Sequence, residues 1–109
     1  MSRDAAIQNS APLFAALGDE TRIRIVSQLG HDGPASITRL TAGSSVTRQA
    51  ITKHLWVLED AGVVRSKRCG RESLWQLERR RLEAARRHLE AISGQWDSAL
   101  ARLRRFVEE

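Results

Sequence analysis

The stretch SITRLTAGSSVTRQAITKHLWVLEDAG, residues 36–62, decides the fold of this chain. It predicts a short helix capped by Ser36, a Gly-Ser-Ser turn, and a longer helix that runs from the capping residue Thr47 to about Ala61. Apolar residues of the longer helix recur at spacings of four and three, which places them on one buried face: Ile51, Leu55 and Leu58. Two helices of unequal length joined by a tight turn are typical of a helix-turn-helix unit.

The residues after this unit change to a β pattern. Residues 63–68 and 72–77 are short β-prone runs, and Gly70 between them supplies the positive φ that a tight hairpin needs. A helix-turn-helix followed by a hairpin predicts a mainly α fold with a small β-hairpin, which is a winged helix-turn-helix.

The residues before the unit are less regular. Residues 1–9 are polar and without a clear pattern, so we expect a flexible arm there. Ser10 is expected to cap a short helix with Pro12 in its first turn, and Asp19 is expected to cap the next helix. The expected buried face of that second helix is apolar at spacings of three: Ile23, Val26 and Leu29.

A long helix is expected over residues 79–107, where two apolar rows each repeat every seven residues for four heptads. This seam is longer than the core of a small domain needs, and it leaves two interpretations open. The helix either folds back on its own domain or forms a homodimer interface, and we favour the dimeric arrangement. The candidate interface residues of the seam are Leu82, Leu89, Ile92, Trp96, Leu103 and Phe106.

Length and charge set the outer limits. The 109 residues suit a single winged-helix domain, with the helix-turn-helix and wing over residues 10–77. The net charge is +5, and residues 36–71 hold seven bases and two acids, whereas the rest of the chain has 11 of each. A basic excess confined to this third of the chain favours a surface that binds a polyanion.

The polar residues on the outer side of the longer helix suit the edges of DNA bases. Arg48 is able to donate two hydrogen bonds to guanine, Gln49 to pair with adenine, and Thr52 to contact a base or a thymine methyl group. Lys53 and the bases of the hairpin suit phosphate oxygens. Double-stranded DNA is the expected partner, and the candidate contacts are Thr47, Arg48, Gln49, Thr52, Lys53, Arg65, Lys67, Arg68 and Arg71.

Three segments resemble the ArsR family of winged-helix repressors: FAALGDETR at residues 14–22, TKHLWVLEDAGVV at residues 52–64, and Gly-Arg-Glu at residues 70–72. The last helix resembles a subgroup that is often paired with small START-like (SRPBCC-type) proteins. The resemblance implies a homodimeric bacterial transcriptional regulator, usually a repressor, whose first and last helices build the dimer interface. It thereby adds Leu13 and Phe14 of the first helix to the candidate interface residues. Two recognition helices in such a dimer would read an inverted repeat.

Metal sensing is not expected, although the best-known ArsR members sense metals. Their ligands are a cysteine pair in the third helix, or sets of Asp, His and Glu in the last helix. Residues 36–41 of this chain hold no cysteine, and the last helix has only His88 with acids at other spacings. We therefore expect no metal and no cofactor, with a sensor that uses a non-standard site as an alternative. The single cysteine, Cys69, excludes an intrachain disulfide.

No enzyme is expected, because nothing in the sequence groups a nucleophile with a base or a carboxylate pair with a cleft. No apolar run reaches the roughly 20 residues of a membrane span, and no signal-peptide pattern opens the chain, so we expect a cytoplasmic protein without a membrane partner. A second hypothesis is a winged-helix protein-interaction module that uses its C-terminal heptad seam to bind another helix.

Trp56 departs from the resemblance, because the family often has lysine or arginine at this position. Helical spacing places Trp56 on the outer side of the longer helix. It packs there either under the hairpin or against the sugar-phosphate backbone of DNA, and the sequence leaves both interpretations open.

Overall fold

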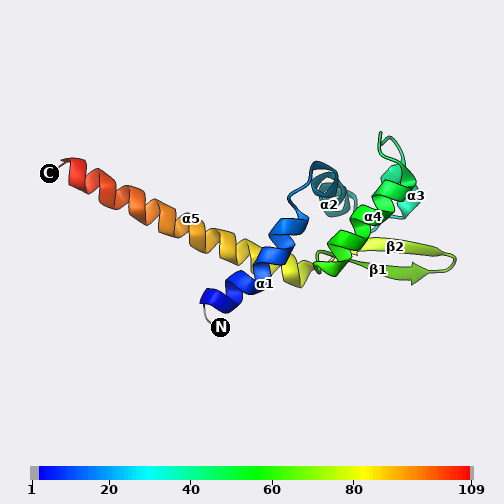
Figure 1. Cartoon of the computed structure of the whole chain (residues 1–109), viewed down its shortest axis with the longest axis horizontal. Coiled ribbons are helices and arrows are strands. Elements are labelled where there is room, and N and C mark those ends of the chain that lie inside the picture. Colours follow the sequence, from blue (N-terminus) through cyan, green and yellow to red (C-terminus); the bar gives the residue numbers. More distant parts are fainter. Residues whose placement is uncertain (1–2, 109) are drawn as a thin grey trace.

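The observed helices and strands occur in the order that the sequence predicted, with the helix-turn-helix in the middle of the chain. The computed structural model describes residues 3–108, over which five helices and two strands follow one another (Figure 1). In chain order they are α1 (Arg3–Ala16), α2 (Glu20–Asp32), α3 (Ile37–Thr41), α4 (Arg48–Asp60), β1 (Val64–Cys69), β2 (Glu72–Leu77) and α5 (Arg79–Glu108). The mainly helical winged helix-turn-helix fold predicted from the sequence is confirmed.

Side-chain caps fix the beginnings of three helices. Asp19, Ser36 and Thr47 each have extended backbone angles, and each side-chain oxygen accepts a hydrogen bond of 3.1–3.2 Å from the backbone N–H three residues on. Such caps satisfy donors that the first turn of a helix leaves without a partner. The predicted starts of α2, α3 and α4 are therefore confirmed.

One row of α4 forms the centre of the hydrophobic core. Leu55 and Leu58 have no exposed surface and Ile51 is 2% exposed, as their spacing predicted. The other elements pack around this row with buried apolar side chains: Leu13, Ala16, Ile25, Leu29, Ala35, Leu40, Val63, Val64, Trp75 and Ala85. Removing one leucine side chain from water stabilises a fold by roughly 1.5–3 kcal/mol, so this row holds α4 in a fixed orientation.

The hairpin is an antiparallel ribbon whose base is joined to the helix-turn-helix. β1 pairs with β2 in register from Val64 opposite Leu77, and Gly70 turns the chain with a φ of 63°. The backbone of Ala35, just before α3, exchanges hydrogen bonds of 3.0 and 2.8 Å with that of Trp75 in β2. This bridge fixes the wing relative to α3.

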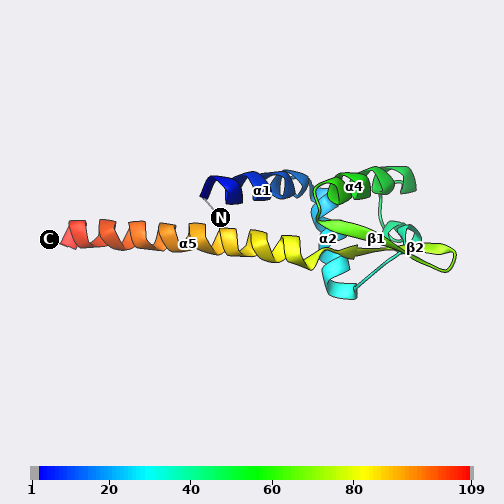
Figure 2. The ribbon, with the colours of Figure 1, turned by 90° about the horizontal axis from the view of Figure 1, so that it is seen from below.

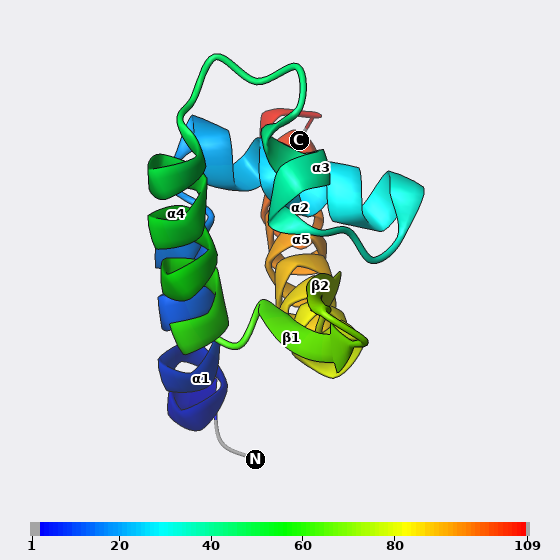
Figure 3. The ribbon, with the colours of Figure 1, turned by 90° about the vertical axis from the view of Figure 1, so that its right-hand side faces the viewer.

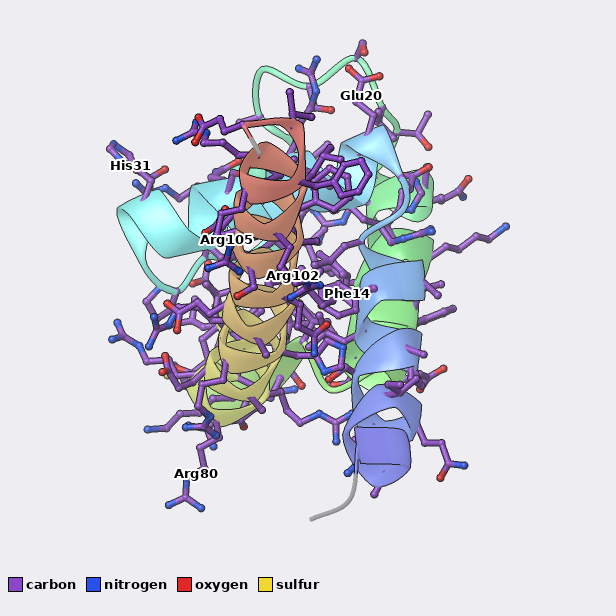
Figure 4. All side chains as sticks on the ribbon, turned by 90° about the vertical axis from the view of Figure 1, so that its left-hand side faces the viewer. Phe14, Glu20, His31, Arg80, Arg102 and Arg105 are labelled. Carbon is purple, nitrogen blue, oxygen red and sulfur yellow. The ribbon has the colours of Figure 1, made fainter. Side chains whose placement is uncertain are left out.

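The two terminal helices lie side by side, away from the wing (Figures 1 and 2). Ala85 of α5 is buried in the core, and the rings of Phe14 and His88 lie 6.5 Å apart between α1 and α5. Figure 4 looks along α5 and shows Phe14 on the side of α1 that faces it. The C-terminal part of α5 projects beyond α1, and the molecule is 66 Å long as a result.

The expectations for the N-terminal segment are wrong. Residues 3–9 form the first half of α1 rather than a flexible arm, and Ser10 and Pro12 therefore lie inside this helix instead of at its start. Residues 1–2 of the expected arm lie outside the described part of the chain. Once the burial of Leu13 has fixed the second half of α1, each further helical residue costs little, because helix propagation is far easier than nucleation.

The expected buried face of α2 is also corrected. Ile23 is 50% exposed, whereas Ile25 is 4% exposed and shares the buried face with Leu29. Residues four apart lie on the same side of a helix. The sequence contains two overlapping apolar rows, and packing against the core selected the row that includes Ile25.

Two glycines, one just after α4 and one inside α5, are expected to respond oppositely to replacement by alanine. Gly62 follows α4 with a φ of 77°, and a Cβ there would lie 3.0 Å from Nε of Arg81, so Gly62→Ala should lower the free energy of unfolding by about 1–2 kcal/mol or more. A Cβ on Gly94, inside α5, would meet nothing within 4 Å, so Gly94→Ala should raise it by ~1 kcal/mol. Urea denaturation at one fixed protein concentration measures both. Changes of the same sign would contradict the assigned backbone conformations.

Candidate nucleic-acid interface

The outward face of α4 carries a row of mostly polar side chains. Gln49, Thr52, Lys53 and Trp56 line one shallow depression on this face, opposite the buried leucines. Their spacing of three and four residues places them on one side of the helix, and Arg48 lies in its first turn. Figure 3 shows α4 at the edge of the molecule with one side uncovered. This uncovered face is the part of the helix that could enter a DNA groove.

Predicted DNA contacts at the start of α4 are already hydrogen-bonded within the chain. The Thr47 hydroxyl caps the helix, Arg48 donates from Nη1 to Oγ1 of Thr38 at 3.1 Å, and Thr52 donates to the carbonyl oxygen of Arg48 at 2.9 Å. Each side chain keeps hydrogen-bonding capacity, because a guanidinium has five N–H donors and a hydroxyl both donates and accepts. Helix α3 therefore orients Arg48 while most of its donors stay available.

The bases of the wing divide between the two faces of the hairpin. Successive residues of a strand point to opposite faces. Arg65 and Lys67 consequently share one face, whereas Arg68 lies on the other, which is the face of the buried Trp75. The sequence had suggested one basic group, and the strand alternation separates it into two.

Two of these bases are engaged within the wing. Nε of Arg65 lies 3.7 Å from a carboxylate oxygen of Glu78, and Nε of Arg68 donates to the carbonyl oxygen of Gly70 at 3.3 Å. Among the described side chains, those of residue 5 and residues 7–108, no ion-pair partner is present for Lys67 or Arg71. Of the wing cations, only Arg65 thus lies beside a carboxylate in the described part of the chain, and Lys67 and Arg71 are the two without an ion pair or a side-chain hydrogen bond there.

The structure brings α4 and the wing to the same end of the molecule, opposite the C-terminal end of α5 (Figures 1 and 2). A hydrogen bond of 3.5 Å from Ser66 of β1 to Glu59 of α4 links the two elements. The basic excess of residues 36–71 is therefore concentrated at one end of the folded chain.

A cluster around Arg22 joins α1, α2 and α4. Arg22 donates from Nε to the carbonyl oxygen of Ala16 at 2.5 Å and from Nη1 to Nδ1 of His54 at 3.2 Å. Because arginine only donates, Nδ1 of His54 accepts, and the neutral ring carries its proton on Nε2. Sequence reasoning missed this contact, since it joins residues 32 positions apart that share no local pattern.

A second arginine holds the C-terminal end of α4. Arg81, in the first turn of α5, donates from Nη2 to the carbonyl oxygen of Ala61 at 3.1 Å. A cation at this end complements the helix dipole and satisfies a carbonyl that the helix leaves without an internal partner. In the sequence, Arg81 is one of three consecutive arginines, and nothing local distinguishes it from its neighbours.

The cap of α2 belongs to the Arg22 cluster. The backbone N–H of Arg22 donates to the carboxylate of Asp19, and this hydrogen bond lowers the pKa of that carboxyl below its usual value. Nδ1 of His54 lies 3.8 Å from the same carboxylate. The backbone of Arg22 and the side chain of His54 thus both approach this carboxylate, which links α4 to the cap of α2.

The exposed apolar side chains gather on the distal part of α5. Leu89, Ile92, Trp96, Leu103 and Phe106, all predicted as dimer contacts, are 48–78% exposed. They follow the heptad rows of the sequence and lie mostly beyond the part of α5 that packs against α1. A contiguous exposed apolar face of this kind is unusual on a monomeric protein.

The other predicted interface residues lie within the protomer. Leu13 is 2% exposed and belongs to the core, so its assignment to the dimer interface is corrected. Phe14 and Leu82 are partly buried against the core. The proximal part of α5 packs on its own domain, and the distal part does not. The same heptad pattern runs through both parts, so the sequence did not distinguish them.

Metal ligands are not grouped among the side chains that the structure describes, those of residue 5 and residues 7–108. No set of three or more His, Cys, Asp or Glu side chains among them could hold a metal ion. His88, the candidate of the non-standard site, lies against Phe14. Cys69 is exposed at the end of β1. No helix within residues 3–108 is both long enough and apolar enough to cross a membrane.

A helix with one buried and one polar face, beside a basic hairpin, defines the class of winged helix-turn-helix DNA-binding proteins. The profile of the family described as Helix-turn-helix domain matches residues 17–67. A curated relative, the HTH-type transcriptional regulator Rv2034 of Mycobacterium tuberculosis, is 33% identical over 95 residues, which cover 87% of this chain and 85% of the relative. The uncharacterized HTH-type transcriptional regulator YuzN of Bacillus subtilis is 46% identical over 69 residues, or 58% of this chain and 75% of the relative.

Among solved structures, an ArsR-like transcriptional regulator from Rhodococcus sp. RHA1 superposes with a TM-score of 0.79 and 37% identity, covering 94% of this chain and 95% of that one. The chain belongs to the ArsR-type family of helix-turn-helix transcriptional regulators. The resemblance noted in the sequence is thereby confirmed, as is the prediction of a DNA-binding regulator rather than an enzyme.

The cap of α2 gives a pH-dependent prediction. Asp19→Ala should lower the thermal midpoint at pH 7, because α2 loses the acceptor of the Arg22 N–H. Since folding lowers the pKa of this carboxyl, its stabilisation is fully present above the ordinary aspartate pKa of about 3.9 and is lost as the pH falls through the lower folded-state pKa. The midpoints of variant and wild type should therefore converge on acidification. Asp97→Ala, an exposed site on α5, serves as the control, and a constant difference for Asp19→Ala at every pH would contradict the assigned cap.

Proposed function

We propose that this protein is a transcriptional repressor that binds an inverted-repeat operator, sequence-specifically and as a homodimer. The observation that carries the proposal is the division of α4 into a buried row and an uncovered polar face at the end of the molecule that bears the wing. A helix of this kind fits the major groove, where each base pair presents a distinct pattern of donors and acceptors.

Base recognition is assigned to the first two turns of α4. Arg48 carries a planar fork of donors that suits O6 and N7 of guanine, and its bond to Thr38 limits the orientations that it samples. Gln49 and Thr52 follow on the same face. Gln49 suits adenine, and Thr52 suits either a base edge or a thymine methyl group. The contacts of recognition helices with base edges come chiefly from this N-terminal part.

Phosphate contacts are assigned to the remaining cations. Lys53 lies on the recognition face, and Lys67 and Arg71 extend the positive charge along the wing. The N–H groups at the start of α4, near Thr47, also favour a phosphate oxygen. These contacts supply affinity and register, whereas the base contacts supply specificity.

Dimerisation is assigned to the distal face of α5. Its 30 residues extend about 45 Å, and the exposed apolar rows would be covered by the same helix of a second copy. A twofold axis through this contact gives two recognition helices, which suits half-sites about 34–36 Å apart on an inverted repeat. A dimer bound over promoter DNA represses by occupying that DNA, and such a regulator works in the cytoplasm with the chromosome.

A gel-shift titration on operator and on random duplex distinguishes residues that read bases from residues that contact phosphates. Arg48→Ala is expected to cost about 1–3 kcal/mol of binding free energy on the operator and little on random duplex, because a bidentate base contact is lost. Lys67→Ala should weaken binding to both and reduce the slope of log K against log salt concentration by about one.

Arg104→Ala is the control for this titration, since it removes the same charge from the exposed distal part of α5. Equal losses for Arg48→Ala on operator and random duplex would exclude base reading by Arg48. Absence of salt-sensitive duplex binding by the wild type would instead favour the protein-interaction module.

The dimer interface is tested by charge insertion. Leu103→Asp places a carboxylate in the exposed apolar row and should convert the dimer to a monomer, as measured by light scattering after gel filtration. Ala101→Asp adds the same charge on the opposite side of α5 and should leave the dimer intact. A wild-type monomer, or a dimer that survives Leu103→Asp, would contradict the assigned interface.

A further inference from the structure

We propose that Trp56 is a specificity-determining residue, whose indole ring reads the methyl group of a thymine in each half-site. This inference rests on the proposed function, because it requires that α4 occupies the major groove of DNA. It gives a base contact to a residue that the assignments above leave without a role. Thr52, the residue there that also suits a thymine methyl group, lies one helical turn before Trp56.

The position of Trp56 gives the first argument. Gln49, Thr52, Lys53 and Trp56 line one depression, at positions i, i+3, i+4 and i+7 of α4. Trp56 therefore lies on the same face as the base-reading residues. It is 55% exposed, which excludes the interpretation that it is buried under the wing.

The charges along α4 give the second argument. The bases of this helix, Arg48 and Lys53, precede Trp56, whereas Glu59 and Asp60 follow it. Carboxylates at the C-terminal end disfavour close approach of phosphates there, so the contact made by this part of the face is not an ionic one. A large apolar ring between these two groups suits an uncharged partner.

The chemistry of the major groove identifies that partner. The thymine C5-methyl group is the apolar feature that a base pair presents in this groove, and side chains recognise it by apolar contact. Seven residues of helix span about 10.5 Å, or about three base pairs at 3.4 Å each. The thymine read by Trp56 should thus lie about three base pairs along the groove from the base read by Gln49.

The experiment selects binding sites from a randomised duplex library with the full-length wild type, Trp56→Ala and Trp56→Phe. The wild type and Trp56→Phe are expected to select thymine at the same position in each half-site, whereas Trp56→Ala should lose that preference and keep the rest of the consensus. Val57→Ala is the matched control, since Val57 is the next residue of α4, is 41% exposed and does not line the depression.

The methyl group is then removed alone, by replacing dT with dU at that position of the selected site. Wild-type affinity should fall about fourfold, the loss expected for one buried methyl group, and the affinity of Trp56→Ala should not change.

Unchanged thymine selection by Trp56→Ala would overturn the inference while leaving the proposed function intact. Equal weakening of Trp56→Ala on dT, dU and random duplexes would assign Trp56 to the sugar-phosphate backbone and overturn it as well. A wild type that selects no consensus would refute the proposed function itself, and the inference with it.

Discussion

The burial of Leu55 and Leu58 is the constraint on which the rest of the structure depends. Neither side chain has exposed surface, and together with Ile51 they fix the rotation of α4 about its axis. Because that rotation is fixed, the residues on the opposite face are uncovered together: Gln49, Thr52, Lys53 and Trp56. A rotation of α4 by one residue, about 100°, would bury polar groups and expose leucines, and both changes are unfavourable.

Two arginines then connect α4 to α1 and to α5, the helix that bears the proposed dimer interface. Arg22 links the side of α4 at His54 to the C-terminal end of α1, and Arg81 links the C-terminal end of α4 to the first turn of α5. Both contacts use carbonyl oxygens at helix ends, where the backbone lacks internal partners. The recognition helix is therefore held relative to α1 and α5 by hydrogen bonds as well as by the core. In the proposed dimer, the spacing of the two recognition helices would follow from how the two copies of α5 pair.

The positive charge of the protein is a local feature rather than a general one. The net charge of +5 equals the excess within residues 36–71, and folding brings this segment to the end of the molecule opposite the C-terminus. Within it, the structure gives the bases different roles: Arg48 is oriented by Thr38, Arg65 lies near Glu78, and Arg68 is bonded to the wing turn. Figure 4 shows Arg80, Arg102 and Arg105 along α5, which is also basic but carries the apolar face.

The sequence by itself determined the features that depend only on neighbouring residues. The caps Asp19, Ser36 and Thr47, the glycine turn at Gly70 and the inner row of α4 all depend on residues within one or two helical turns, and each lies where the pattern predicted. The face of α4 followed from the same periodicity. Only the tertiary structure decided that Ile25 rather than Ile23 is buried, that residues 3–9 continue α1, that Leu13 belongs to the core, and that Arg22 and Arg81 hold α4. These outcomes depend on which surfaces of distant segments meet. Several local patterns are compatible with the sequence, and hydrophobic burial, a property of the whole chain, selects among them.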